Sequence, residues 1–204
     1  MNNQEINKTQ GKKANTMHSL KMKIFLLVFI AIIFAIGLCL LMIVPKSKSN
    51  LETVIENYMK DVTVVEGENL DRELAREGAD TVLSAEALQD DLKGISISGM
   101  PSSYAYIFSG TDGTMLYHPT ADKIGLPVEN VAAKQLLTEI GEGKKPEPSV
   151  IEYEFKGKQK YAAYYIGNEA AFVLIITADG DEVFASLNET TNYSLIGALV
   201  LILV

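Results

Sequence analysis

The sequence is poor in the residues that build covalent or metal-based frameworks. Its 204 residues include one cysteine, Cys39, no tryptophan and two histidines. A single cysteine excludes a disulfide framework and any multi-cysteine metal site. Positive charge is also scarce, with 18 basic against 26 acidic residues and a net charge of −8. Because phosphate neutralisation needs a basic surface, we expect no nucleic-acid partner. The hydrophobic fraction of 48% in turn excludes a wholly disordered chain.

A long apolar run lies near the N-terminus. Residues 24–44 carry no charge, and a helix of this length covers roughly 31 Å, the thickness of the hydrocarbon core of a bilayer. A cleaved signal peptide would have a shorter apolar stretch and a small-residue cleavage site, so we predict an uncleaved transmembrane helix. Residues 1–23 contain five lysines and one acid, which predicts a disordered tail on the cytoplasmic side of the cell membrane.

A second apolar segment ends the sequence. Residues 194–204 are uncharged but reach only about half of a bilayer as a helix. We expect the start of a second transmembrane helix that the sequence cuts short, with a downstream signalling module missing; a buried C-terminal strand is the alternative. Residues 45–193 hold the other 13 basic and 25 acidic residues. They are predicted to form an acidic extracytoplasmic domain tethered to the membrane at both ends.

The first part of this domain has helical periodicity. Over residues 50–93, apolar positions recur at intervals of 4, 3, 4 and 3. This spacing fits either the seam of a coiled-coil homodimer or one amphipathic helix packed on its own sheet, and Gly67 is expected to weaken the helix. The positions concerned are Leu51, Ile55, Tyr58, Val62 and Val65.

The remainder of the domain alternates like strands, with two helices between or after them. Asp112-Gly113 predicts a hairpin between the first two strands, because this turn requires positive φ. The run 172–177 is apolar on both faces and should be the central strand. We therefore predict an α+β fold in which a long N-terminal helix packs on a five-stranded antiparallel sheet. The expected strands are 103–109, 114–119, 150–155, 159–166 and 172–177, and the expected helices are 128–140 and 181–192.

No catalytic arrangement is visible. His118 is the only histidine outside the predicted cytoplasmic tail, and neither a HExxH nor a nucleophile-elbow motif occurs. We expect no enzymatic activity, no cofactor and no metal site. Tyrosine is the distinctive residue, because seven of the nine tyrosines lie on the four strands that flank the central one.

Tyrosine on strands has two explanations. Sheet packing accounts for most of these side chains, but aromatic rings with hydroxyl groups also suit a small-molecule pocket. We expect two to four of them to line a cavity. Alternation places Tyr104 with Tyr106 on one face and Tyr161 with Tyr165 on one face, and leaves open which face forms the pocket. Tyr117 and Tyr153 complete the set of candidate tyrosines.

Four segments together resemble the Cache sensor domains of bacterial transmembrane chemoreceptors, the methyl-accepting chemotaxis proteins. They are YAYIFSGTDGTMLYHP at 104–119, IGLPVEN at 124–130, EYEFKGKQKYAAYYIGN at 152–168 and FVLIITADGDEVF at 172–184. The resemblance covers residues 50–193 and implies a PAS-like sheet behind a long helix, in the single-lobed form, with a small-molecule pocket on the sheet.

The resemblance also suggests ligand contacts. In related amino-acid-binding Cache domains an acid at the end of the last strand holds the ligand ammonium, and Asp179 occupies the matching place. Those domains hold the carboxylate with an Arg-x-Trp-Tyr motif, whereas this chain has no tryptophan and its arginines, Arg72 and Arg76, lie in a predicted helix. Asp179 is equally interpreted as the cap of the following helix. His118, before Pro119, either closes its strand or contacts the ligand.

We therefore predict the sensor portion of a membrane receptor, most simply a chemoreceptor, that detects a small polar metabolite. The ligand would be a carboxylate, an amino acid or an amine. The sensor of a histidine kinase or of a nucleotide cyclase is one alternative. A membrane-anchored structural or interaction domain without a small-molecule ligand is the other.

Overall fold

The computed structural model describes residues 20–185, 189, 191–194 and 196–197, and Ser47–Tyr193 form one compact unit. Its first element, α1 (Leu20–Glu77), is the one helix in the described part of the chain that is long and apolar enough to cross a membrane. Most of the predicted cytoplasmic tail, residues 1–19, and most of the predicted second transmembrane segment at 194–204 lie outside the described residues.

Helix α1 is longer than the sequence pattern predicts. It continues through Pro45 and through Gly67, and it ends only before Gly78, whose φ of 85° favours glycine. The expected weakening at Gly67 is wrong because this glycine serves a tertiary contact. A Cβ at Gly67 would overlap the ring of Tyr165, so the absent side chain lets the helix lie directly on the sheet. The rest of the predicted 50–93 helix is split into α2 (Ala79–Val82) and α3 (Ala85–Leu92).

The five strands form one antiparallel sheet with the order β2-β1-β5-β4-β3. All seven residues of β5 are buried, which confirms the prediction of a central strand. The hairpin between β1 and β2 contains Gly113 at a φ of 75°, as the Asp-Gly pair predicts. The strands are β1 (Tyr104–Phe108), β2 (Met115–Tyr117), β3 (Val150–Phe155), β4 (Lys158–Ile166) and β5 (Val173–Asp179).

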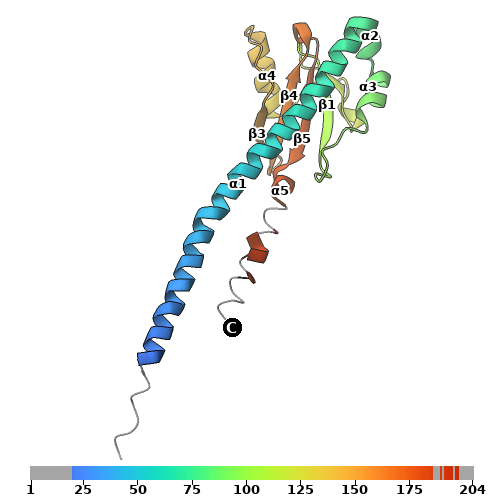
Figure 1. The fold of residues 1–204 in the computed structure, drawn as a ribbon. Coiled ribbons are helices and arrows are strands. Elements are labelled where there is room, and N and C mark those ends of the chain that lie inside the picture. Colours follow the sequence, from blue (N-terminus) through green and yellow to red (C-terminus); the bar gives the residue numbers. More distant parts are fainter. Residues whose placement is uncertain (1–19, 186–188, 190, 195, 198–204) are drawn as a thin grey trace, which may run out of the picture. The chain divides into compact units, whose positions relative to one another are not determined.

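Helices cover both faces of this sheet (Figure 1). Alternate residues of β5 point to opposite faces, so Leu174 and Ile176 join the core under α1, α2 and α3, while Val173 and Ile175 join the core under α4 (Val131–Gly141). The predicted α+β fold, with a long helix on a five-stranded antiparallel sheet, is confirmed. The two faces are chemically separate, and this separation decides which tyrosines can share a pocket.

The apolar positions of α1 do not form one seam. Ile55 and Val62 pack against the core beneath the helix, whereas the side chains of Tyr58 and Val65 are exposed. Packing on the domain's own sheet thus accounts for part of the pattern, and the homodimer stays a prediction.

The helix predicted at 181–192 is interrupted near its start. Helix α5 (Gly180–Val183) ends at Phe184, whose φ and ψ of −103° and 1° are not helical. The ring of Phe184 packs edge-on against Tyr161 at 6.0 Å and lies 4.5 Å from Nζ of Lys48. These tertiary contacts break the expected continuity, and residues 186–188 and 190 of the predicted helix lie outside the described residues.

Candidate functional site

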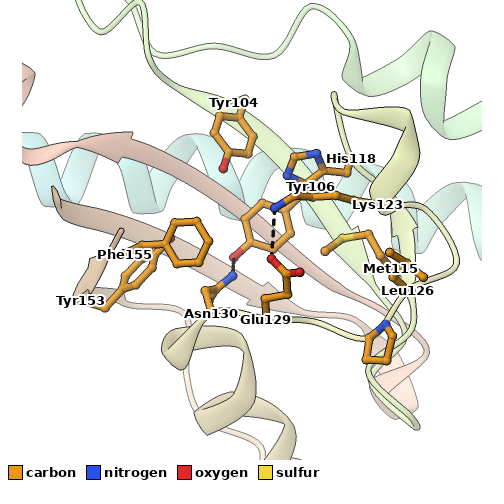
Figure 2. A pocket seen from close by; sticks show the side chains of 11 residues that line it. Tyr104, Tyr106, Met115, His118, Lys123, Leu126, Glu129, Asn130, Tyr153 and Phe155 are labelled. Atoms are coloured by element: carbon orange, nitrogen blue, oxygen red, sulfur yellow. Dashed lines mark hydrogen bonds and ion pairs between the residues drawn. The ribbon is translucent and has the colours of Figure 1, made fainter. Parts of the chain in front are cut away.

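A small cavity lies on the α4 face of the sheet, between the strands and the segment that connects β2 to α4 (Figure 2). Its volume is about 30 Å³, enough for roughly two water molecules. Strands β1, β2 and β3 contribute Tyr104, Tyr106, Met115, Tyr153 and Phe155. The connecting segment contributes His118, Lys123, Leu126, Pro127, Glu129 and Asn130.

Strand alternation explains why these tyrosines meet. Residues two apart on a strand share a face, which places Tyr104 beside Tyr106 on β1 and Tyr153 beside Phe155 on β3. The rings of Tyr104 and Tyr106 are 6.1 Å apart. Burial raises the pKa of the Tyr106 and Tyr153 hydroxyl groups, so both remain neutral at physiological pH and can act as hydrogen-bonding groups.

Asn130 fixes one side of the cavity. Its Oδ1 accepts a hydrogen bond from the backbone N–H of Ala133 at 2.8 Å and caps α4. Its Nδ2 donates to the hydroxyl of Tyr106 at 2.9 Å. One side chain therefore joins the start of α4 to the floor of the cavity, and both ends of its amide group are oriented by these bonds.

His118 supplies an oriented donor. Its Nδ1 accepts a hydrogen bond from the backbone N–H of Thr120 at 2.9 Å, so the proton of the neutral ring is carried by Nε2. Burial, together with the nearby Lys123 ammonium, lowers the pKa of His118 from 6.5 to about 4. The ring is thus neutral at pH 7. It packs edge-on against Tyr104 at 5.3 Å and on the tilted ring of Tyr106 at 5.9 Å.

An ion pair lies at the edge of the cavity. Nζ of Lys123 is 3.5 Å from a carboxylate oxygen of Glu129 (Figure 2). The same ammonium group lies 5.6 Å from the ring centre of Phe155. A cation and an anion are therefore available to a ligand within a mostly aromatic lining, the arrangement expected of a small-molecule site.

Asp179 is held by lysines and does not cap α5 with its side chain. Its two carboxylate oxygens accept hydrogen bonds from Lys158 at 2.6 Å and from Lys160 at 2.5 Å. Lys158 and then Lys160 lower the pKa of this carboxyl group. Lys160 is also close to the cavity, because its Nζ lies 5.8 Å from the ring centre of Tyr104.

The structure separates the eight predicted site residues. Tyr104, Tyr106, His118 and Tyr153 line the cavity, so three of the candidate tyrosines are in it, and Asp179 lies beyond its wall. The remaining three belong to the opposite face of the sheet, in the core under α1, α2 and α3; they are Tyr117, Tyr161 and Tyr165.

Two tyrosines of this face, Tyr161 and Tyr165, have hydrogen-bond partners on α1. The hydroxyl of Tyr161 donates to Glu52 at 2.8 Å, and that of Tyr165 donates to Asp71 at 2.8 Å. Both bonds fasten α1 to β4. Glu52 also belongs to a group of three carboxylates, with Glu56 and Glu152, whose oxygens lie within 4.8 Å of one another. Surface acids commonly cluster in this way, and we assign no metal site there.

Apart from His118, the cavity residues of the connecting segment were not predicted from the sequence, and neither was Lys160. The segment 124–130 is one of the four that carry the Cache resemblance, but the sequence does not predict it as a wall of the pocket. Lys160 could have been found from strand register, because it is opposite Tyr153 on β3 and Asp179 on β5.

A larger hollow of about 330 Å³ lies between α1 and α3. It is an open groove with charged side chains of both signs, including Arg72, which donates a hydrogen bond to Asn69. It lacks the aromatic walls of the cavity on the α4 face, so we take the smaller cavity as the candidate ligand site.

Comparison with known proteins gives structural likenesses only. No protein-family model matches the sequence, and a search of curated proteins finds no match. Among solved structures, the ligand-binding domain of Mlp24 with asparagine has 14% identity and a TM-score of 0.37 over 50% of this chain and 38% of that chain. The ligand-binding domain of the Pseudomonas aeruginosa PAO1 amino acid chemoreceptor PctB with L-Arg has 20% identity and a TM-score of 0.34 over 49% of this chain and 39% of that chain.

The Escherichia coli DcuS sensor domain has 14% identity and a TM-score of 0.39, over 68% of this chain and 98% of that chain. This chain spans about two fifths of the Mlp24 and PctB domains. The functional proposal rests on the cavity itself.

Proposed function

We propose that residues 47–193 are the ligand-binding domain of a membrane-anchored receptor and that the cavity on the α4 face binds a small polar metabolite. The observation that carries this proposal is the composition of the cavity. Aromatic rings from β1 and β3 form its walls, and a few oriented polar groups converge on it, as in small-molecule sites generally.

The polar groups favour a ligand with hydrogen-bond acceptors. The Nε2–H of His118 and the ammonium of Lys123 are donors, and the carboxylate of Glu129 is the one acidic group in the lining. A carboxylate or an amino acid would use these donors, and an amino acid or an amine would also use Glu129. We propose binding without chemical conversion, because the cavity lining offers no nucleophile paired with a base.

The small volume implies that the cavity opens on binding. A metabolite of even five or six heavy atoms exceeds a space of about 30 Å³. We propose that the segment 118–130 is the wall that moves, because it connects β2 to α4 and is not itself a strand of the sheet. Separation of Lys123 from Glu129 would open the cavity. The ammonium group of Lys123 and the carboxylate of Glu129 would then both be available to the ligand.

We place the receptor in the cell membrane. The apolar first part of α1 is the anchor, and the lysines of residues 1–23 favour a cytoplasmic N-terminus and an extracytoplasmic sensor. A methyl-accepting chemoreceptor working as a homodimer is the proposed context. A histidine kinase or nucleotide cyclase is the alternative.

Calorimetric screening of the full chain in detergent micelles tests the proposal. A library of carboxylates, amino acids and amines should yield a ligand, and at 100 times its Kd this ligand should stabilise the fold by about 2.7 kcal/mol. Leu126→Trp fills the exposed mouth of the cavity and should weaken binding at least tenfold. Val131→Trp alters another exposed aliphatic residue, outside the lining, and should leave binding unchanged. If no compound in the library binds, the result favours the alternative of a structural or interaction domain without a small-molecule ligand.

A further inference from the structure

Two lysines share one carboxylate beside the cavity. Lys158 and Lys160 both donate hydrogen bonds to Asp179, one to each oxygen. The lysines differ in burial, since the side chain of Lys158 is 63% exposed and that of Lys160 is 11% exposed. Lysine is rarely buried to this degree without a specific partner, and Asp179 is the one ion-pair partner of Lys160 among the described residues.

Lys160 lies behind Tyr104, one of the aromatic residues that line the cavity. Strand register places it opposite Tyr153, and its Nζ lies 5.8 Å from the ring centre of Tyr104; both tyrosines line the cavity. Within the described part of the chain, no hydrogen bond holds the hydroxyl group of Tyr104. Rotation of this side chain would therefore connect the cavity to the ammonium group without breaking a hydrogen bond.

Because Lys158 and Lys160 share one carboxylate, Lys160 can change its ion-pair partner at a small cost in free energy. Removal of one partner from a buried ion pair is normally costly, because it leaves an uncompensated charge. Here Asp179 would remain paired with Lys158 if Lys160 turned away. Lys158 itself is near two further acids, Asp181 and Glu182. An acidic group that entered the cavity would supply the new partner of Lys160, so no charge would be left alone.

We propose that Lys160 recognises the negative charge of the ligand. Its ammonium group would leave Asp179 and form an ion pair with an acidic group of the bound metabolite. This inference rests on the proposed function of the cavity and narrows it to anionic ligands. It also reverses the role that the Cache resemblance suggests for Asp179. That carboxylate is already occupied by two ammonium groups, and it acts as the resting partner of Lys160 instead of a contact for a ligand ammonium.

Matched variants of the full chain in detergent micelles test the role of Lys160. The probes are propionate and succinate, their amides propionamide and succinamide, and propylamine, each titrated by calorimetry. The wild-type chain should bind an acid more tightly than its amide. Lys160→Met should weaken binding of the acid at least tenfold, about 1.4 kcal/mol, and leave the amide unchanged. Lys158→Met would leave Asp179 unpaired once Lys160 turned away, so it should also weaken binding of the acid. Lys134→Met changes an exposed lysine outside the cavity lining and should change acid binding less than twofold.

A second variant and a folding control keep the outcome interpretable. Lys160→Gln retains polarity and should give the same loss, and circular dichroism should show that both Lys160 variants melt cooperatively. Acid binding of wild-type strength in either folded variant overturns the role of Lys160. Equal or tighter binding of the amides or of propylamine to the wild-type chain also overturns it, while the cavity remains a ligand site. If neither these probes nor any library compound binds, the proposed function itself fails.

Discussion

Acidification should destabilise the fold through His118, and the structure gives the size of the effect. The pKa of this residue is lowered from 6.5 to about 4 by burial and by Lys123. Because the folded pKa lies below the unfolded value, the unfolded chain binds more protons between these two pH values. The stabilisation is fully present above pH 6.5 and is lost as the pH falls toward 4. At 1.36 kcal/mol per pH unit, the loss is about 2 kcal/mol at pH 5 and about 3 kcal/mol at pH 4.

The assay is urea unfolding of the full chain in detergent micelles, followed by circular dichroism at pH 7.5, 6 and 5. His118→Gln removes the titrating group and retains a side chain that can accept the hydrogen bond from Thr120. The difference in unfolding free energy between the two proteins should shrink by about 2 kcal/mol from pH 7.5 to pH 5. Other groups titrate alike in both proteins, so their contributions cancel in this difference in unfolding free energy. A difference that does not change with pH would refute the reasoning that His118 is buried in its neutral form.

Three substitutions test the contacts that build the domain. Gly67→Ala should lower the free energy of unfolding by about 1–3 kcal/mol, because its Cβ meets Tyr165, whereas Gly94→Ala, with open space around it, should not. Asn130→Ala should cost about 1–2 kcal/mol through the lost cap of α4, and an unchanged unfolding curve would contradict this role. Tyr165→Phe should cost about 1 kcal/mol through its bond to Asp71, and Tyr58→Phe, on the exposed side of α1, is its control.

The sheet was predictable because its signals are local. Alternation predicts four of the five strands, the Asp112-Gly113 pair predicts one turn, and the apolar run at 172–177 predicts the fifth strand, which is buried on both faces. The exact extent of α1 was not predictable. Gly67 is normally unfavourable inside a helix, and its benefit comes from Tyr165, a residue that lies far away in sequence.

The candidate site was only partly predictable for the same reason. Alternation grouped Tyr104 with Tyr106 and Tyr161 with Tyr165, but the choice between faces depends on what covers each face. Helix α1 covers the second pair through hydrogen bonds that span 109 and 94 residues. The pocket wall at 118–130 and the pairing of Lys160 likewise follow from tertiary arrangement, which local periodicity does not encode.

Hydrogen–deuterium exchange of the full chain with and without the tightest ligand from the screen tests the central claim most directly. Ligand in the cavity on the α4 face should slow exchange of backbone amides in residues 118–130 and in β1, because the bound molecule contacts both and holds the opened wall in one arrangement. Protection confined to residues 66–92, around the open groove between α1 and α3, or no protection at all would contradict the assignment of the site.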